Sequence, residues 1–134
     1  MIKITLPWPP SLNHYKKMGG FSRTKSGKLF QKRVNSKDTM QFYFDVWVLA
    51  KQIHDKLGTK FYHDGTIELE VYLCLHPPHQ KRYDADNFAK VVIDSLMHAK
   101  LIKDDSQITK LVIEKKEFVV GGKVIVRIDE MIRL

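Results

Sequence analysis

Between Ile67 and Leu75 every second residue is aliphatic, and the residues between them are mostly polar or aromatic. A period of two predicts a β-strand that buries one face and turns the other toward solvent. Two consecutive prolines at positions 77 and 78 end the run, because proline has no N–H for a sheet ladder. The 134 residues suffice for one hydrophobic core but not for two. We therefore expect a single domain over residues 1–134, built around a sheet.

Two longer segments have helical periodicity. Apolar residues recur at intervals of three and four over residues 37–57, where Gly58 follows as the stop and either Ser36 or Asp38 is the expected N-cap. A second amphipathic pattern covers about residues 87–100, without an internal glycine or proline. Each helix is expected to pack one apolar face on the sheet.

Further strands are expected at both ends of the chain. Residues 2–6 alternate, and strands at about 107–120 and 123–128 flank Gly121 and Gly122, a dipeptide typical of a tight hairpin. The order of elements is then β-α-β-α-β-β. It indicates an α+β (α/β-like) domain with a mixed four-stranded sheet, closed by a C-terminal hairpin and packed against two helices.

The positive charge is concentrated near the N-terminus. The chain has 23 Lys and Arg against 15 Asp and Glu, and no acid precedes Asp38. Glycine and serine interrupt the basic run, so we expect a flexible basic loop at about residues 14–37. Such a loop either grips DNA phosphates or is simply a solvated surface. The candidate DNA-binding residues are Asn13, His14, Lys16, Lys17, Arg23, Lys25, Lys28, Lys32 and Arg33.

The single cysteine, Cys74, excludes an internal disulfide, and its place in an apolar run predicts a buried thiol. No apolar stretch approaches the roughly 18 residues of a membrane span. We expect a cytoplasmic protein without a membrane partner.

Acidic residues gather around the start of the second predicted helix. Asp84 and Asp86 are two apart, so their carboxylates point the same way if the chain approaches the helix in an extended conformation. Two such carboxylates repel unless a cation stabilises them, and a site without a Cys or His cluster suits Mg²⁺ better than zinc. Asn87 and Lys90 follow, and Asp104 with Asp105 forms a second acidic pair.

Simpler interpretations remain open for these residues. Asp86 is also a suitable N-cap, and Asp86 with Lys90 is also an ordinary i,i+4 surface pair. Asp104 and Asp105 also fit a polar turn before a strand.

Three motifs resemble those of one known family. Residues 6–13 (LPWPPSLN), the D-x-D-N-x-x-K run over residues 84–90 and residues 103–108 (KDDSQI) are similar to the RusA-type Holliday junction resolvases in order and spacing. The glycine-rich residues 24–30 resemble that family's basic loop less distinctively.

The resemblance implies a homodimeric, Mg²⁺-dependent endodeoxyribonuclease, with Mn²⁺ as a possible substitute, that resolves four-way DNA junctions by paired nicks during recombination and repair. It implies catalytic roles for Asp84, Asp86, Lys90 and Asp105. The three aspartates and Asp104 are the implied metal ligands, with Asn87 in support.

Two other functions are consistent with the sequence. They are a non-catalytic basic protein that binds junctions, and a metal-dependent nuclease for flaps or RNA. A helix over residues 87–100 is about 20 Å long and carries the chain away from Asp84. Asp105 therefore either returns to the site of its own subunit through a taut connection or belongs to the site of a two-fold partner.

Overall fold

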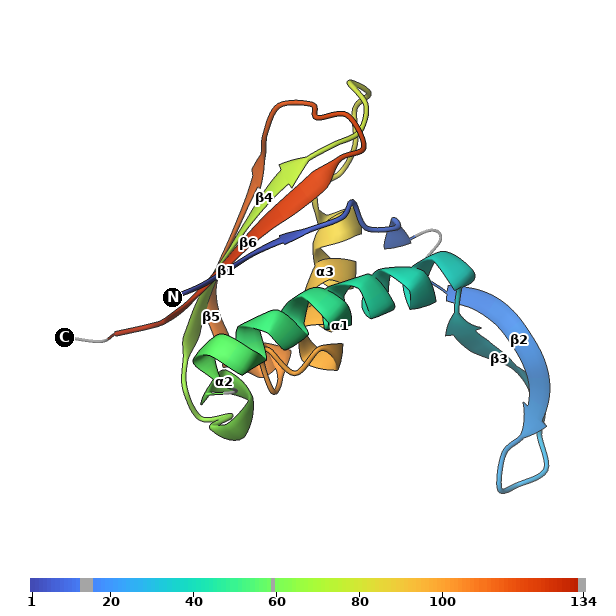
Figure 1. The fold of residues 1–134 in the computed structure, drawn as a ribbon. Helices are drawn as coiled ribbons and strands as arrows, with labels where there is room; N and C mark the ends of the chain where they lie inside the picture. The colour runs from blue at the N-terminus through green and yellow to red at the C-terminus, as the bar shows by residue number, and fades with distance from the viewer. Residues whose placement is uncertain (13–15, 59, 133–134) are drawn as a thin grey trace.

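The period-two segments form one mixed sheet in the computed structural model, which describes residues 1–12, 16–58 and 60–132. Its strands are β1 (Ile2–Leu6), β4 (Leu69–His76), β5 (Ile108–Lys115) and β6 (Lys123–Glu130), in the spatial order β1-β6-β4-β5. β4 pairs parallel with β5 and antiparallel with β6, and β6 pairs antiparallel with β1. The predicted fold class is confirmed (Figure 1).

The buried face of the sheet is continuous across the strands. Val126 lies opposite Ile4 on one side and Leu73 on the other, and all three are buried. Burial of an aliphatic side chain of this size stabilises a fold by about 1.5–3 kcal/mol. Rows like this one fix the register, because a slip by one residue would turn the aliphatic side chains to the solvent face.

The first predicted helix is found at its predicted bounds, as α1 (Lys37–Leu57). Ser36, rather than Asp38, is the N-cap, and its side chain accepts a hydrogen bond from the backbone N–H of Thr39 at 3.2 Å. Gly58 ends the helix with a φ of 75°, which disfavours residues with a Cβ. Leu57 is the last residue of the apolar pattern that predicted this helix, but it is exposed in the last turn.

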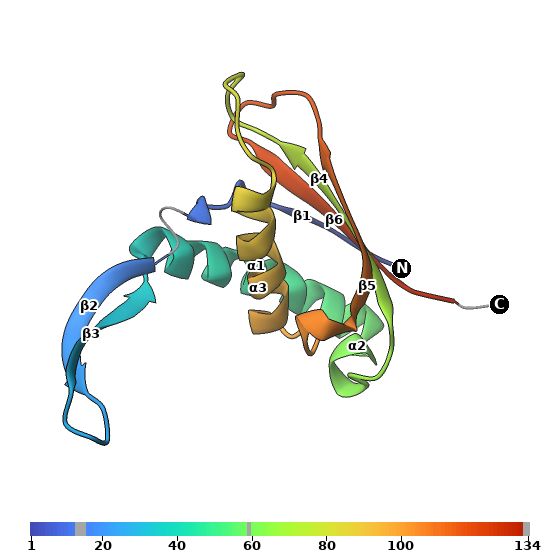
Figure 2. The same cartoon turned by 180° about the vertical axis from the view of Figure 1, so that it is seen from behind.

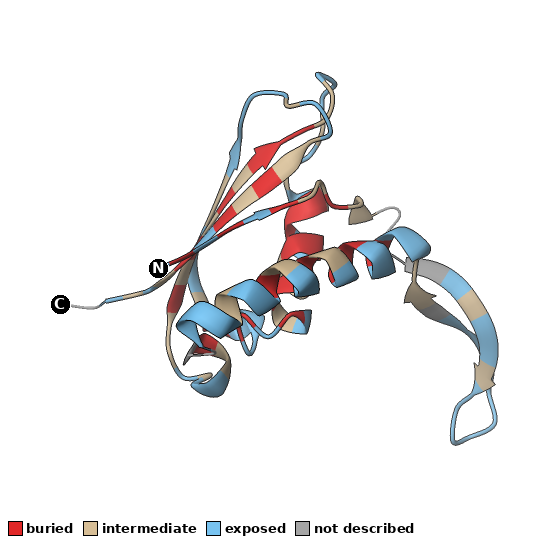
Figure 3. Ribbon diagram, in the orientation of Figure 1, coloured by how far each residue is buried: buried red, intermediate tan, exposed pale blue. Residues whose placement is uncertain are grey.

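The second predicted helix is α3 (Asp86–His98), and α1 and α3 cover the same face of the sheet (Figures 1 and 2). Their buried sides meet the aliphatic face of the sheet in one core (Figure 3). Two short elements were not predicted: the four-residue helix α2 (Lys60–His63) and the 3₁₀ turn η2 (Asp105–Gln107).

The segment expected to be a flexible basic loop is instead an antiparallel ribbon of β2 (Lys16–Arg23) and β3 (Leu29–Asn35). The N–H of Thr24 donates a hydrogen bond to the carbonyl of Lys28, the carbonyl of Thr24 accepts one from the N–H of Gly27, and Gly27 has a φ of 88°. The sequence did not predict these two strands, because a register shift between Met18 and Phe21 breaks the alternation of side chains along β2. Figures 1 and 2 show that the ribbon extends from the N-terminal end of α1, away from the sheet.

The turn at Gly121 and Gly122 joins β5 to β6 as expected, with φ angles of 80° and 70°. β4 lies between these strands, however, so they do not pair with each other as the strands of a simple hairpin do. Cys74 is half-buried rather than buried, because it alternates with the core residues of β4 and lies on the other face. No helix in the described ranges is long and apolar enough to cross a membrane.

Candidate active site

A cluster of aromatic rings fixes the segment that leads into α3. The ring centroids of Trp8 and Phe88 are 4.8 Å apart, and Tyr83 makes edge contacts with both at 5.7 Å. Trp8 belongs to the proline-rich segment after β1, and Phe88 lies in the first turn of α3. The cluster therefore ties the N-terminal segment to the helix start that carries Asp84 and Asp86.

The turn between β5 and β6 packs against the same segment. A Cβ at Gly122 would lie 2.9 Å from side-chain atoms of both Trp8 and Pro78. Only glycine fits this close approach, and its positive φ adds a second reason.

Asp84 and Asp86 are exposed at the N-terminal end of α3, but they do not flank an extended residue as the sequence led us to expect. Ala85 has helical angles (φ −61°, ψ −38°) and is the N-cap, and the carbonyl of Asp84 accepts a hydrogen bond from the N–H of Asn87 at 3.2 Å. Asp86 therefore lies in the first turn rather than at the N-cap. The positive end of the helix dipole favours a carboxylate there.

An open cavity of about 610 Å³ lies beside this helix start. Asp84 and Asn87 line it, together with two cations, Arg82 and Lys115. Asp86 and Lys90 are not among its lining residues. The cavity thus combines a carboxylate, which can bind a metal, with side chains that can bind phosphate.

Lys115 has defined contacts at this cavity. Its ammonium group donates a hydrogen bond to the carbonyl of Tyr83 and lies 4.5 Å from the centre of the Tyr83 ring. Burial raises the pKa of the Tyr83 phenol, so the ring adds no negative charge to the cavity at neutral pH. A second basic cavity, of about 300 Å³, adjoins the first and shares Arg82, Tyr83 and Lys115 with it.

Lys90 pairs with Asp94, one turn further along α3, and not with Asp86. The Nζ–Oδ distances to Asp94 are 3.2 and 3.3 Å. The Lys90 side chain is 59% exposed and that of Asp94 only 16%, so the pair holds the lysine on the solvent side of the helix.

Asp104 and Asp105 lie beyond the opposite end of α3, which is about 20 Å long. The hydroxyl of Ser106 donates to Asp104 at 2.8 Å. This hydrogen bond is the largest cause that lowers the pKa of Asp104, and a hydrogen bond with the side chain of the neighbouring Asp105 is the second. Both carboxylates are exposed, as in a polar turn before a strand.

Gln107 organises this opposite end. Its buried side chain accepts hydrogen bonds from the N–H groups of Lys103 and Asp104 and donates to three carbonyl groups in residues 61–67. It thereby fixes the backbone that presents the second acidic pair.

The two acidic pairs do not form a single site within one chain. In residues 1–12, 16–58 and 60–132, no group of three or more His, Cys, Asp or Glu side chains lies close enough to hold a metal ion.

Sequence reasoning gave no role to Arg82 or Lys115. Parallel pairing of β4 and β5 places the carboxyl ends of both strands at one edge of the sheet, where the segment to Asp84 begins. This pairing, had it been predicted, would have indicated that Lys115 lies near Asp84.

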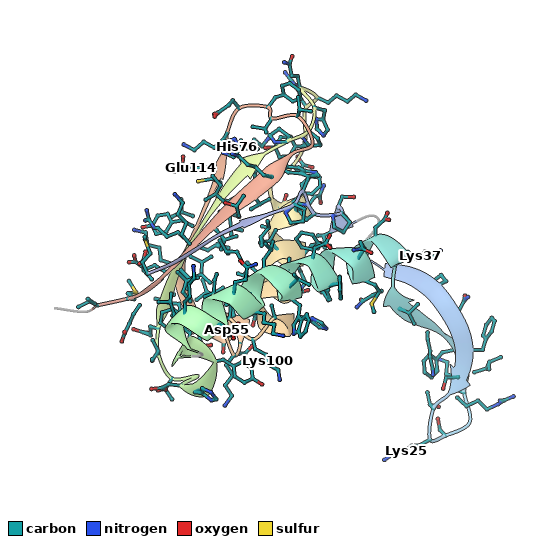
Figure 4. All side chains as sticks on the ribbon, viewed as in Figure 1. Lys25, Lys37, Asp55, His76, Lys100 and Glu114 are labelled. Carbon is teal, nitrogen blue, oxygen red and sulfur yellow. The ribbon has the colours of Figure 1, made fainter. Side chains whose placement is uncertain are left out.

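The ribbon carries most of the candidate DNA-binding residues. Lys25, Lys28 and Lys32 are exposed, and Figure 4 shows Lys25 at the tip. Arg23 donates a hydrogen bond to the carbonyl of Gly27 at 3.0 Å and so also stabilises the turn. Asn13 and His14 lie outside the described residues. The backbones of Lys16, Lys17 and Arg33 belong to the ribbon.

Comparison with known proteins gives one consistent result. The family model described as "Endodeoxyribonuclease RusA" matches residues 7–129. The crossover junction endodeoxyribonuclease of Enterobacteria phage HK97 is 28% identical over 131 residues, which cover 96% of this chain and 94% of the relative. The proteins of that name from Escherichia coli K12 and Enterobacteria phage 82 are 28% and 30% identical, each over 96% of this chain and 93% of the relative.

Proposed function

Because the chain belongs to the endodeoxyribonuclease RusA family, we propose that it is an endonuclease that cuts crossover junctions, the four-way branch points of DNA. The structural observation that supports this function is the cavity at the N-terminal end of α3, where Asp84 lies with Arg82 and Lys115. A metal-dependent phosphodiesterase can use both kinds of group, because a carboxylate can hold a metal while cations attract the phosphate.

The donor set fits a hard divalent cation. Asp84 and Asp86 offer exposed carboxylates, Asn87 offers an amide, and no thiol or imidazole is among the described residues that line the cavity. Mg²⁺ is commonly bound by one or two carboxylates, completed by water and substrate phosphate, and Mn²⁺ accepts the same ligands. When bound, such an ion supplies Lewis-acid activation of the phosphate and of the attacking water.

The cations of the chain have separate roles in this proposal. Arg82 and Lys115 bind the phosphates of the strand to be cut, because both line the cavity beside Asp84. Lys90 lies one turn after Asp86, where its ammonium group can neutralise charge that develops on the phosphate. Lys90 pairs with Asp94 in the structure, so this role requires its ammonium group to leave that pair when a strand binds.

Asp105 belongs, in this proposal, to the site of a second copy, with Asp104 in support. The length of α3 keeps both acids away from Asp84 within one chain. Two α3 helices related by a two-fold axis perpendicular to them run antiparallel, and in that arrangement the C-terminal end of one can meet the N-terminal end of the other. A homodimer also suits the substrate, because a four-way junction offers two equivalent strands.

The ribbon grips DNA outside the catalytic cavity. Lys25, Lys28 and Lys32 are exposed along it, and each phosphate that they neutralise releases condensed counterions. Asn13, His14, Lys16, Lys17, Arg23 and Arg33 are proposed to contribute to the same surface.

Incubation with labelled four-way, flap and duplex DNA and with RNA, each with and without Mg²⁺, tests the function. We expect paired nicks only in the four-way junction and only with the metal. Junction binding without cleavage under all metal conditions would identify a non-catalytic binder. Faster cleavage of flaps or RNA would assign another substrate.

A further inference from the structure

The second cavity, of about 300 Å³, lies directly beside the cavity that contains Asp84. Its walls come from the segment after β4 and the segment after β5, which leave the sheet at the same end (Figures 1 and 2). Ligands commonly bind beyond the carboxyl ends of parallel strands. The proposed nuclease uses only Arg82 and Lys115 of this flanking cavity, because they also line the cavity of Asp84.

The segment after β5 contributes an aromatic ring, Phe118, on a backbone that is held on both sides. The N–H groups of Lys116 and Val119 donate to carbonyl groups at and just after the end of β4, at 2.8 and 3.0 Å. The ring of His76 adds a contact to the carbonyl of Glu117 at 3.1 Å. Phe118 itself is 40% exposed. The structure therefore fixes the backbone of this ring without burying the ring in the core.

The segment after β4 contributes polar groups without charge. Nδ1 of His79 accepts a hydrogen bond from the N–H of Lys81 at 3.2 Å, which leaves the other ring nitrogen as a donor. Gln80 is exposed, and its side-chain amide offers both a donor and an acceptor. Groups of this kind match the edge of a nucleobase, whereas a phosphate is bound best by cations.

The cations are placed to hold the backbone of a strand that passes from one cavity to the other. Arg82 and Lys115 line both cavities, so a strand with one phosphate beside Asp84 can place the adjoining nucleotide in the flanking cavity. Lys116 also lines the flanking cavity, but its ammonium group pairs with Glu114 at 2.9 Å. That partner leaves Lys116 less able to bind a phosphate.

We propose that the flanking cavity receives one unpaired nucleobase of the strand to be cut, and that this base stacks on Phe118. The base belongs to a nucleotide next to the phosphate at Asp84, so the inference rests on the proposed function. Ligand cavities hold about 300–1,000 Å³, and a cavity at the lower end of that range suits a single base rather than a base pair. A site for phosphate alone would have no use for an exposed ring.

A four-way junction makes such a base available. The helical stack is interrupted at the branch point, so a base there loses fewer stacking contacts on leaving its helix than a base within a duplex. Extrusion of a base costs least where pairing and stacking are already weak. A base cavity beside the cleavage site thereby favours cleavage close to the branch point over cleavage of plain duplex.

Coupling between Phe118 and single bases tests the proposal. The wild type and Phe118→Ala are compared on the intact junction and on junctions with an abasic analogue at one position near the cut, in single-turnover reactions with Mg²⁺. We expect Phe118→Ala to slow cleavage of the intact junction by about 10-fold, as for the loss of one stacked base. At the position whose base the cavity receives, the abasic analogue should abolish this difference, because nothing remains to stack on the ring.

Two further substitutions separate stacking from packing. Phe118→Leu keeps an apolar side chain without a ring and should cut as slowly as Phe118→Ala, whereas Phe118→Tyr keeps the ring and should cut at the wild-type rate. Val120→Ala is the matched control, because Val120 is 87% exposed in the same connection and is not among the lining residues. Thermal unfolding verifies that every variant is folded.

A binding measurement without divalent metal separates this inference from the nuclease function. 2-Aminopurine, whose fluorescence is quenched by stacking in a helix, is placed in turn at each position around the branch point. The wild type should raise the fluorescence several-fold at one position, and Phe118→Ala should raise it less there. An increase without any cleavage in the Mg²⁺ reactions would contradict the nuclease function and support the base cavity.

Three results would overturn the proposal. An equal effect of Phe118→Ala on the intact junction and on every abasic junction would make Phe118 a purely structural residue. Wild-type cleavage by Phe118→Leu would show that no base stacks on the ring. Unchanged 2-aminopurine fluorescence at every position would show that no base leaves its helix in the complex.

Discussion

The two ends of α3 carry acidic pairs of similar sequence in different surroundings. At the N-terminal end Asp84 opens into a cavity that it shares with Arg82 and Lys115. At the C-terminal end Asp104 is bound by Ser106, and buried Gln107 fixes the backbone from below. The first end presents a carboxylate to an open cavity beside cations, and the second presents exposed carboxylates on a turn that hydrogen bonds fix.

The two ends are therefore suited to different tasks. A carboxylate beside two phosphate-binding cations can hold a metal and a strand of DNA together, whereas a rigid exposed turn is suited to meet another molecule. Neither end is a complete metal site in the described part of the chain. The comparison therefore predicts different consequences for changes at the two ends.

The largest expected effect is at the N-terminal end. Asp84→Asn should lower the rate of junction cleavage by roughly 10²- to 10³-fold, because it removes a charged ligand while the basic side chains remain. Junction affinity, measured by gel shift, should stay within about two-fold, since phosphate contacts dominate it. Asp55→Asn, an exposed aspartate of α1 (Figure 4), is the control and should cut at the wild-type rate. Normal cleavage by Asp84→Asn would remove this carboxylate from the site.

A change beneath the C-terminal end should act on stability. Gln107→Ala removes five hydrogen bonds to backbone groups and should lower the free energy of unfolding by about 2–4 kcal/mol. Gln41→Ala, which removes an exposed bond to Asp45 on α1, should change it by less than about 0.5 kcal/mol. Denaturant titration gives both values. Equal losses of unfolding free energy in the two variants would mean that Gln107 does not stabilise the backbone at the C-terminal end of α3.

The glycine turn tests the scaffold behind the N-terminal end. Gly122→Ala should destabilise the protein by about 2–3 kcal/mol, because its Cβ would meet Trp8 and Pro78 at a positive φ. Gly121→Ala has the same backbone strain without a close neighbour and should cost about 1 kcal/mol. If thermal unfolding ranks the two variants in the opposite order, the turn does not pack on the aromatic cluster.

The smallest expected effect is a loss of junction affinity when the exposed lysines of the ribbon are replaced. Replacing Lys25, Lys28 and Lys32 together by Ala should weaken binding and reduce the salt dependence of log K by about 0.9 for each phosphate that the ribbon no longer neutralises. Replacing Lys51, Lys56 and Lys100, which lie away from the ribbon, is a control of equal charge. An unchanged slope in the ribbon variant would show that these lysines do not touch DNA.

The parts of the fold that local patterns determine were predictable. α1 followed from its apolar period, a serine cap and a terminal glycine, and β1 followed from three alternating aliphatic residues. The ribbon was not predictable in the same way, because Gly19 and Gly20 interrupt its alternation and its strands are rich in charge. Its pairing depends on the turn at Gly27 rather than on a buried face.

The candidate site was predictable only as far as neighbours in sequence define it. Asp84 and Asn87 are close in the chain, so their grouping at one helix end followed from spacing, whereas Lys90 pairs with Asp94 one turn further along. Lys115 was missed because its contact with Tyr83 spans 32 positions and depends on parallel pairing of β4 with β5. Arg82 is close to Asp84 in sequence, but spacing did not show that both side chains line one cavity. The helical angles of Ala85 were also missed, because spacing alone does not distinguish an extended residue from a helical one at this position.

Mixed dimers of Asp84→Asn and Asp105→Asn subunits test most directly whether the two ends of α3 act together across a dimer. Each variant alone should fail to cut junctions. If the sites are shared, the heterodimer contains one site with both substitutions and one with neither, so refolding the two variants together should restore nicking. If each site belongs to one subunit, both sites are damaged. No recovery of nicking in verified heterodimers would contradict the shared site.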